Sequence, residues 1–245
     1  MTIKILPRPS EERGHADHGW LNSYHTFNFA DYWDHRFQEF GPLRVINEDI
    51  VQGGAGFPTH PHREFEIWSY VVSGELKHQD STGTNETIGR GQVQFTTAGT
   101  GVTHSEFNAH PKNPVHFIQI WAKPDEAKLP PSYQTMEWSE SDKTNKLCLI
   151  VKPLEKTAGK AISCHTDLSM YASILSKENQ VVHTIESAGR RQYIHLINTG
   201  GKLEVNGVRL NSGDGAFITE AQDDDQLVIV SVGEEPAEFL LFDMK

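Results

Sequence analysis

Short runs of apolar or alternating residues, each closed by Gly, Pro, Asn, Asp or Ser, recur along most of this 245-residue chain. The first half contains LRVINEDIV, FEIWSYVVSG, ETIGRGQVQFTTAG and PVHFIQIWAKP. The second half contains QYIHLINTGGKLEVNGVRL and DQLVIVSV. Many short strands with regular turn signals are typical of antiparallel sandwiches and barrels. We therefore predict an all-β fold made of two β domains in tandem.

Two segments lack this strand pattern. The first 40 or so residues are mixed polar and aromatic, which predicts an irregular arm with one or two short strands, packed across the body of the protein. After Trp121 the polar stretch KPDEAKLPPSYQTMEWSESDKTNK contains prolines and has no periodicity, which predicts a linker. The expected boundaries are 1–125 for the first domain with its arm, 126–145 for the linker and 146–245 for the second domain.

Composition excludes several classes of partner. The chain has 22 Lys and Arg against 33 Asp and Glu, a net charge of -11 that repels phosphate backbones and anionic lipid. No apolar stretch approaches the roughly 18–20 residues that span a bilayer. The N-terminus carries no apolar signal core, and two cysteines make no disulfide scaffold. We therefore expect no direct nucleic-acid binding, no membrane span and a cytoplasmic location.

Histidine is concentrated in the first half, where ten of the thirteen precede residue 117. His60 and His62 are two residues apart, and His104 and Glu106 repeat that spacing. On a strand, side chains two apart share a face. If the two strands lie side by side, three imidazoles and one carboxylate converge, a donor set that suits a first-row divalent metal. Since no cysteine is near, an open and reactive site is expected rather than a closed structural zinc site.

The residues around these pairs resemble the pirin family of the cupin superfamily. The resemblance rests on GFPTHPHREFEIWSYVVSGELKHQDSTG, GQVQFTTAGTGVTHSEFN, the GPLRVINED run at 41–49 and the segment from Trp20 to Phe29. It covers roughly residues 15–125, and LNSGDGAFI carries a looser resemblance to the second pirin cupin. One departure is Ala98, where many cupins place a proline.

The resemblance implies two tandem cupin barrels (double-stranded β-helix, or jelly-roll) with one metal ion in the N-terminal barrel and none in the C-terminal one. It implies His60, His62, His104 and Glu106 as ligands. Fe(II) is the expected metal, with Mn, Co, Ni, Cu and Zn as alternatives. A monomer is expected, because two barrels in one chain can cover each other's exposed sheets.

Other residues are predicted to surround the metal. Glu66 follows His62 by four residues, and we place it on the same strand face, either as a further ligand or hydrogen-bonded to a ligand imidazole. His25 is expected to cap the pocket from the arm. His78 and His116 are interpreted as core or rim histidines, and Gln119 and Trp121 as barrel filling. The expected aromatic wall consists of Phe57, Phe65, Trp68, Phe95 and Phe117.

The resemblance implies a metal-dependent dioxygenase that opens the ring of a flavonol such as quercetin with O2. In that hypothesis Glu106, or Glu66 behind it, takes the substrate hydroxyl proton as the general base. One alternative is a non-catalytic, redox-sensing iron protein that binds a protein partner, in the nucleus if the source is eukaryotic. A third is a different cupin enzyme that acts on another enol, because the same ligands serve many reactions.

Overall fold

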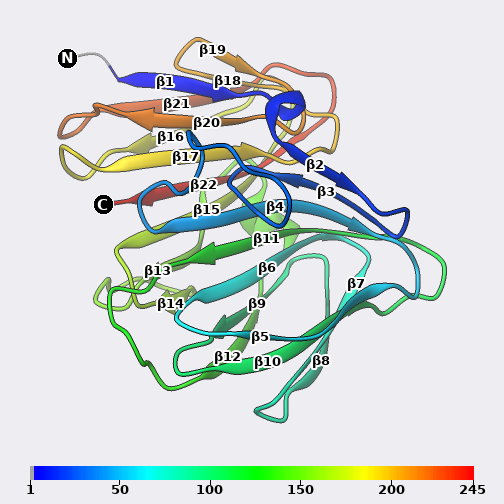
Figure 1. Cartoon of the computed structure of the whole chain (residues 1–245). Helices are drawn as coiled ribbons and strands as arrows, with labels where there is room; N and C mark the ends of the chain where they lie inside the picture. The colour runs from blue at the N-terminus through cyan, green and yellow to red at the C-terminus, as the bar shows by residue number, and fades with distance from the viewer. Residues whose placement is uncertain (1–2) are drawn as a thin grey trace. The chain divides into compact units, whose positions relative to one another are not determined.

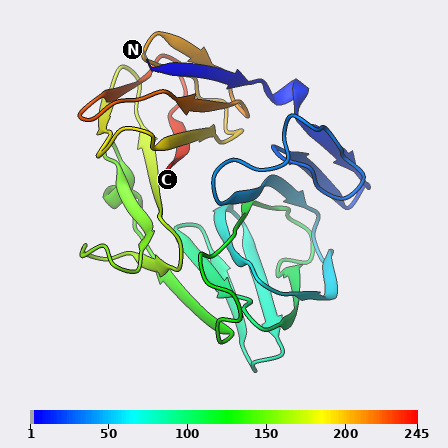
Figure 2. The same ribbon diagram turned by 60° about the vertical axis from the view of Figure 1, so that its left-hand side comes forward.

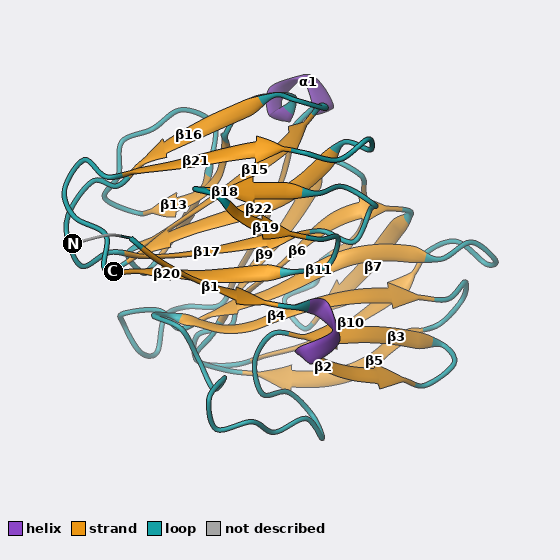
Figure 3. Cartoon of the chain, turned by 90° about the horizontal axis from the view of Figure 1, so that it is seen from above, coloured by secondary structure: helices purple, strands orange, loops and turns teal. Residues whose placement is uncertain are grey.

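A computed structural model describes residues 3–245, and strands account for nearly all of its regular structure (Figure 3). The helical pieces are η1 (Ser10–Glu12) and α1 (Glu140–Lys143). Within the described residues, neither helical piece is long or apolar enough to cross a membrane. The prediction of an all-β protein is confirmed.

The chain divides into two compact units. The first unit is Gly14–Trp138, and the second combines residues 3–13 with Ser139–Lys245. Each unit contains one seven-stranded and one four-stranded sheet, and all strand pairs except β13 with β14 are antiparallel.

The larger sheet of the first unit has the order β12-β9-β6-β11-β4-β3-β2, and the smaller one has the order β5-β10-β7-β8 (Figure 1). Side chains of the two sheets meet in the interior, where Ser69 and Gln119 of the larger sheet contact Glu106 of the smaller. The strands are β2 (Gly14–Asp17), β3 (Leu21–His25), β4 (Leu43–Val51), β5 (Gly56–His62), β6 (Glu66–Ser73), β7 (Glu75–Asp80), β8 (Asn85–Gly89), β9 (Gln92–Thr97), β10 (Val102–Asn108), β11 (Val115–Ala122) and β12 (Ser132–Glu137).

The second unit repeats this plan with sheets ordered β1-β20-β17-β22-β15-β13-β14 and β16-β21-β18-β19. Its core draws aliphatic side chains from both sheets, among them Ile194, Leu241, Leu227 and Ile229. The strands are β1 (Lys4–Arg8), β13 (Cys148–Pro153), β14 (Ile162–Cys164), β15 (Leu168–Leu175), β16 (Gln180–Thr184), β17 (Arg191–Leu196), β18 (Leu203–Val205), β19 (Val208–Leu210), β20 (Gly215–Thr219), β21 (Gln226–Ser231) and β22 (Ala237–Met244).

The first strand of the chain belongs to the second unit, whereas the sequence prediction placed it in the first domain. Strand β1 pairs along its whole length with β20, from Lys4 opposite Thr219 to Arg8 opposite Gly215. The blue strand consequently runs along the orange C-terminal strands of the second unit (Figure 2). The predicted domain 1–125 is wrong for these residues, because the short KILPR segment completes the edge of a sheet formed much later in the chain.

The predicted linker 126–145 also needs correction. Its middle forms β12, which pairs with β9 from Ser132 opposite Thr97 to Glu137 opposite Gln92. Only one side of an edge strand is paired, and such strands tolerate polar side chains. Strand β12 therefore shows no apolar alternation, although Tyr133 and Thr135 are partly buried.

Candidate metal centre

Strands β5 and β10 lie side by side and bring the two predicted pairs together. His104 stands opposite His60, and Val102 stands opposite His62. The register then slips by one residue, so that Glu106 faces Phe57. Pro58 lies in the slipped stretch and has no N–H to give to the ladder, which favours such a bulge there.

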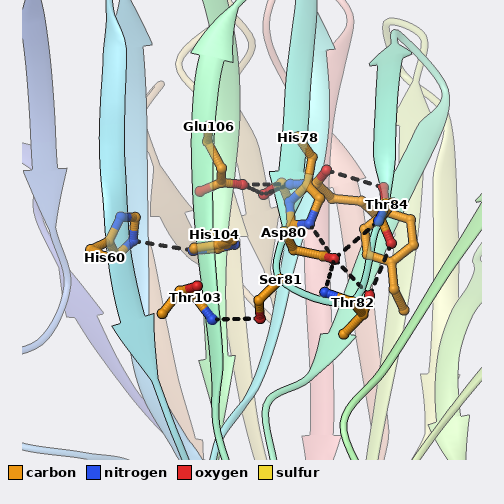
Figure 4. Close-up of polar contacts among 12 residues, drawn as sticks. His60, His78, Asp80, Ser81, Thr82, Thr84, Thr103, His104 and Glu106 are labelled. Atoms are coloured by element: carbon orange, nitrogen blue, oxygen red, sulfur yellow. Dashed lines mark hydrogen bonds and ion pairs between the residues drawn. The ribbon is translucent and has the colours of Figure 1, made fainter.

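The three imidazoles form a compact group. The ring centres of His60, His62 and His104 lie 4.6–4.7 Å from one another, and their candidate ligand atoms all fall within 4.8 Å. His60 Nε2 and His104 Nε2 are 3.1 Å apart (Figure 4). Two ligands bound at right angles, each about 2.1 Å from one ion, would lie about 3 Å apart.

Hydrogen bonds and burial prepare these rings for a metal. The Nδ1 of His60 donates to the carbonyl of Pro58 at 2.7 Å, which leaves Nε2 as the free lone pair. Buried His62 Nε2 and His104 Nδ1 have no hydrogen-bond partner among residues 3–245. Burial, reinforced by the neighbouring imidazoles, lowers the pKa of both His62 and His104 to about 3. Both rings are therefore neutral near pH 7, the state in which histidine binds metal.

The carboxylate of Glu106 is held by the opposite sheet. Gln94 Nε2 donates to its Oε1 at 2.5 Å, and Gln119 Nε2 donates to its Oε2 at 3.2 Å. Ser69 Oγ lies 3.2 Å from Oε1 and donates to Gln119 Oε1 at 2.5 Å. Glu106 is 3% exposed, so its orientation is fixed by protein groups rather than by bulk water.

The residues that hold Glu106 belong to a row of polar side chains that crosses five adjacent strands of the larger sheet. On adjacent strands, Gln94 stands opposite Ser69, Ser69 opposite Gln119, Gln119 opposite Asn47 and Asn47 opposite His25. We call these five residues the polar row. The sequence prediction missed Ser69 and Gln94 and assigned Gln119 to barrel filling. A single polar residue inside an apolar strand, as in IWSY and QVQF, was the available signal.

His78 also belongs to this region, although it was interpreted as a core or rim histidine. It stands opposite Glu106 on β7, and its Nε2 donates to Asp80 Oδ2 at 2.9 Å. Its Nδ1 is buried without a partner among the described residues, and His78, His104 and Glu106 form a second possible ligand group. The His78-x-Asp80 spacing, which repeats that of the other pairs, could have identified it.

Glu66 does not lie where it was predicted. It begins β6 in the larger sheet, beyond a turn in which Glu64 has a φ of 59°. Glu66 and Ser69 are three positions apart on one strand, so the Glu66 side chain lies on the sheet face opposite that of Ser69, which contacts Glu106. Thr97 donates to Glu66 there at 3.1 Å. Its predicted place on the face of His62 is therefore wrong.

A cavity of about 90 Å³ opens beside the imidazoles. Since one water needs roughly 10–15 Å³ by the same measure, the cavity has room for more than one water molecule. His25, Phe57 and Phe117 line it, and so do Gln119 and Trp121, which were interpreted as barrel filling. Trp68 was expected in this wall, but it stacks on Phe95 with ring centres 5.2 Å apart, on the sheet face that carries Glu66. The lining residues are Ala16, His18, Leu21, Ser23, His25, Phe29, Ala30, Asn47, Asp49, Phe57, His60, Glu106, Phe117, Gln119 and Trp121.

Comparisons with known proteins cover both units. The family model described as Pirin matches residues 7–122, and the model described as Quercetinase C-terminal cupin domain matches residues 150–244. A protein of Escherichia coli K12 named quercetin 2,3-dioxygenase is 39% identical over 240 residues, 98% of each chain. The crystal structure of YhhW from E. coli superposes with a TM-score of 0.88 at 38% identity, covering 99% of this chain and 98% of that one. A structure of bacterial pirin YhhW in complex with nickel(II) gives a TM-score of 0.87 at 38% identity, covering 98% and 99%.

Proposed function

The chain belongs to the pirin family of two-barrel cupin proteins, and on that basis we propose that it is a metal-dependent dioxygenase that opens the ring of a flavonol such as quercetin with O2. The observation that carries this proposal is the group of His60, His62 and His104, which shares His104 with a second group that contains Glu106, beside an aromatic-lined cavity. Relatives named quercetin 2,3-dioxygenase support the reaction type.

The proposed ligands are His60, His62, His104 and Glu106, and Fe(II) is the proposed metal. The unpartnered Nε2 of His62, the neutral imidazoles of His62 and His104 and the fixed Glu106 carboxylate fit a divalent first-row ion. The nickel(II) complex of the E. coli pirin supports binding of a divalent first-row ion. When bound, the metal would supply a Lewis-acid site for the substrate oxygens and a redox partner for O2.

The residues of the chain would orient the substrate and move one proton. A flavonol carries a hydroxyl beside a carbonyl, and this end would lie at His60 and Glu106. Glu106 would accept the hydroxyl proton, while the Gln94 and Gln119 amides keep its carboxylate in place. The rings of Phe57, Phe117 and Trp121 would pack on the flat substrate and exclude water.

Oxygen consumption by iron-loaded protein with quercetin tests this proposal, run beside the His62→Ala variant. The expected result is oxygen uptake and a ring-opened product from the wild type alone. Iron-loaded wild type that consumes oxygen with another enol but not with quercetin would support a different cupin enzyme. Protein that holds iron and turns over no enol would support the iron-binding regulator with a protein partner. The monomeric state and the cytoplasmic location stay predictions.

A further inference from the structure

At the end of the polar row away from Gln94, the cavity is lined by polar side chains that the proposed reaction does not use. They are Ser23 and His25 of β3 and Asn47 and Asp49 of β4, which we call the distal polar cluster. All four line the cavity that His60 and Glu106 also line, and none is more than 4% exposed. The cluster is thus covered by protein while it faces the space where a substrate would lie.

Hydrogen bonds hold the cluster in one arrangement. The Ser23 hydroxyl donates to Asp49 Oδ1. The Nδ1 of His25 lies 2.9 Å from Asn47 Oδ1 and 3.3 Å from Ser23 Oγ. A carboxylate offers about four acceptor positions, so the Asp49 carboxylate can accept a substrate hydroxyl beside its protein partners.

Strand order sets the separation from the metal end. Strand β11, which carries Gln119 beside Glu106, neighbours β4, and β4 neighbours β3. Asp49 stands opposite Phe117, two residues along β11 from Gln119. With about 4.8 Å between strands and about 3.4 Å per residue, Asp49 lies about 8 Å from Gln119, and β3 lies about 10 Å from β11. Aromatic rings form much of the remaining wall, including Phe29, Phe57, Phe117 and Trp121. Polar side chains of the cavity thus continue from Glu106 and Gln119 through Asn47 to Asp49, with aromatic rings beside them.

We propose that Asp49, oriented by Ser23, determines specificity by accepting a hydrogen bond from a hydroxyl group on the part of the substrate remote from the metal. The inference rests on the proposed function, because it assumes that the other end of the substrate lies at His60 and Glu106. It narrows the substrate class to flat aromatic enols that carry a second, distal hydroxyl. A charged acceptor makes a stronger hydrogen bond than a neutral one, so the Asp49 carboxylate discriminates against ligands without that donor.

Anaerobic binding to the iron-loaded protein tests the proposal without turnover. The two probes are quercetin and 3-hydroxyflavone, which share the hydroxyl–carbonyl end but differ in their other hydroxyls. Wild type should bind quercetin about tenfold more tightly or better, the worth of one charge-assisted hydrogen bond. Asp49→Asn keeps the size and removes the charge. It should cut quercetin affinity about tenfold and change 3-hydroxyflavone affinity by less than about twofold.

Glu48→Gln is the matched control. Glu48 is the adjacent carboxylate on β4, faces the other side of the sheet and accepts from His116 at 2.8 Å, so its loss should leave the ratio of the two affinities unchanged. The proposal would be overturned if Asp49→Asn left the ratio of quercetin affinity to 3-hydroxyflavone affinity at the wild-type value, either with no loss or with equal losses for both probes. If the wild type turns over quercetin but binds quercetin and 3-hydroxyflavone equally well, the proposed role of Asp49 in recognition is wrong, while the proposed function stands. Wild type that binds neither probe would overturn the proposed function as well.

Discussion

His60 Nε2 and His104 Nε2 lie 3.1 Å apart across the paired strands β5 and β10. The Nδ1 proton of His60 is engaged by Pro58, so the two Nε2 atoms are turned toward a common point. The relationship follows from register alone, because the two residues stand directly opposite each other. A metal ion at that point would replace the contact between the two nitrogens with two ligand bonds.

Replacing single histidines should distinguish metal ligands from residues that support the ligands, because the two kinds of residue affect Fe(II) affinity to different extents. His62→Ala deletes a proposed ligand and should lower Fe(II) affinity more than about 100-fold, whereas His78→Ala should lower it about tenfold, the scale of residues that support ligands. Iron content after dialysis against a graded chelator measures both. The reverse order would assign the ion to the group of His78, His104 and Glu106.

The two buried glutamates should differ in their effect on turnover. Glu106→Gln removes the proposed base and should slow turnover by about 100-fold or more at saturating iron. Glu66→Gln changes a carboxylate on the opposite face of the larger sheet and should leave turnover within about twofold of wild type. Steady-state oxygen uptake at matched iron content measures this difference. A large loss in Glu66→Gln with none in Glu106→Gln would move the base to Glu66.

Asp80 should make the metal-free protein sensitive to acid. Burial raises the pKa of Asp80, but hydrogen bonds from Thr82, His78 and Thr84 outweigh that effect and bring it to about 2. Because the folded pKa is depressed, the stabilisation is complete above the unfolded value of 3.8 and is lost as the pH falls toward 2. It amounts to on the order of 1 kcal/mol.

Unfolding in urea with chelator present, followed between pH 6 and pH 2.5, measures this contribution. Asp80→Asn should be less stable than wild type at pH 6, and the difference should shrink toward pH 2.5. A difference that stays constant over this range would show that the charge of Asp80 contributes nothing to the free energy of unfolding.

A buried ion-pair network should stabilise the second unit. Asp243 accepts from His183 Nε2 at 2.5 Å and from Arg190 Nε, and Arg190 also binds both oxygens of Asp167 at 3.0 Å. Burial raises the pKa of Asp243, but the His183 and Arg190 hydrogen bonds hold it below its usual value. Asp243→Asn leaves Arg190 without its buried counter-charge and should cost about 3 kcal/mol of unfolding free energy.

Asp167→Asn provides the comparison, because the Asp167 side chain is 42% exposed and exposed pairs contribute little. Its expected cost is below about 1 kcal/mol. Equal costs for Asp167→Asn and Asp243→Asn in the same urea titration would contradict the assignment of Asp243 as the centre of the network.

The ligand group could be predicted from sequence because it depends on two local rules. His60 and His62 share a face through the period of a strand, and His104 and Glu106 do so on a second strand. Antiparallel pairing of β5 with β10 then brings the pairs together. The one-residue slip at Pro58 changes which residue faces Glu106 but keeps His60 opposite His104.

The sequence predictions were wrong where a residue's position depends on the pairing of strands that are distant in sequence. Glu66 lies four residues from His62, but the turn between them starts a strand in another sheet, so strand periodicity does not extend across it. The polar row joins residues from five strands that are distant in sequence, and only the sheet order reveals that Gln94 and Gln119 meet Glu106. The pairing of β1 with β20 depends in the same way on contacts that no local pattern records.

Anomalous diffraction at the iron absorption edge, from crystals of iron-loaded protein, tests the central claim most directly. The account predicts one strong peak about 2.0–2.3 Å from the Nε2 atoms of His60, His62 and His104 and from a carboxylate oxygen of Glu106. A peak that contacts His78 instead of His62, or one that lies outside this group of residues, would contradict the proposed metal centre.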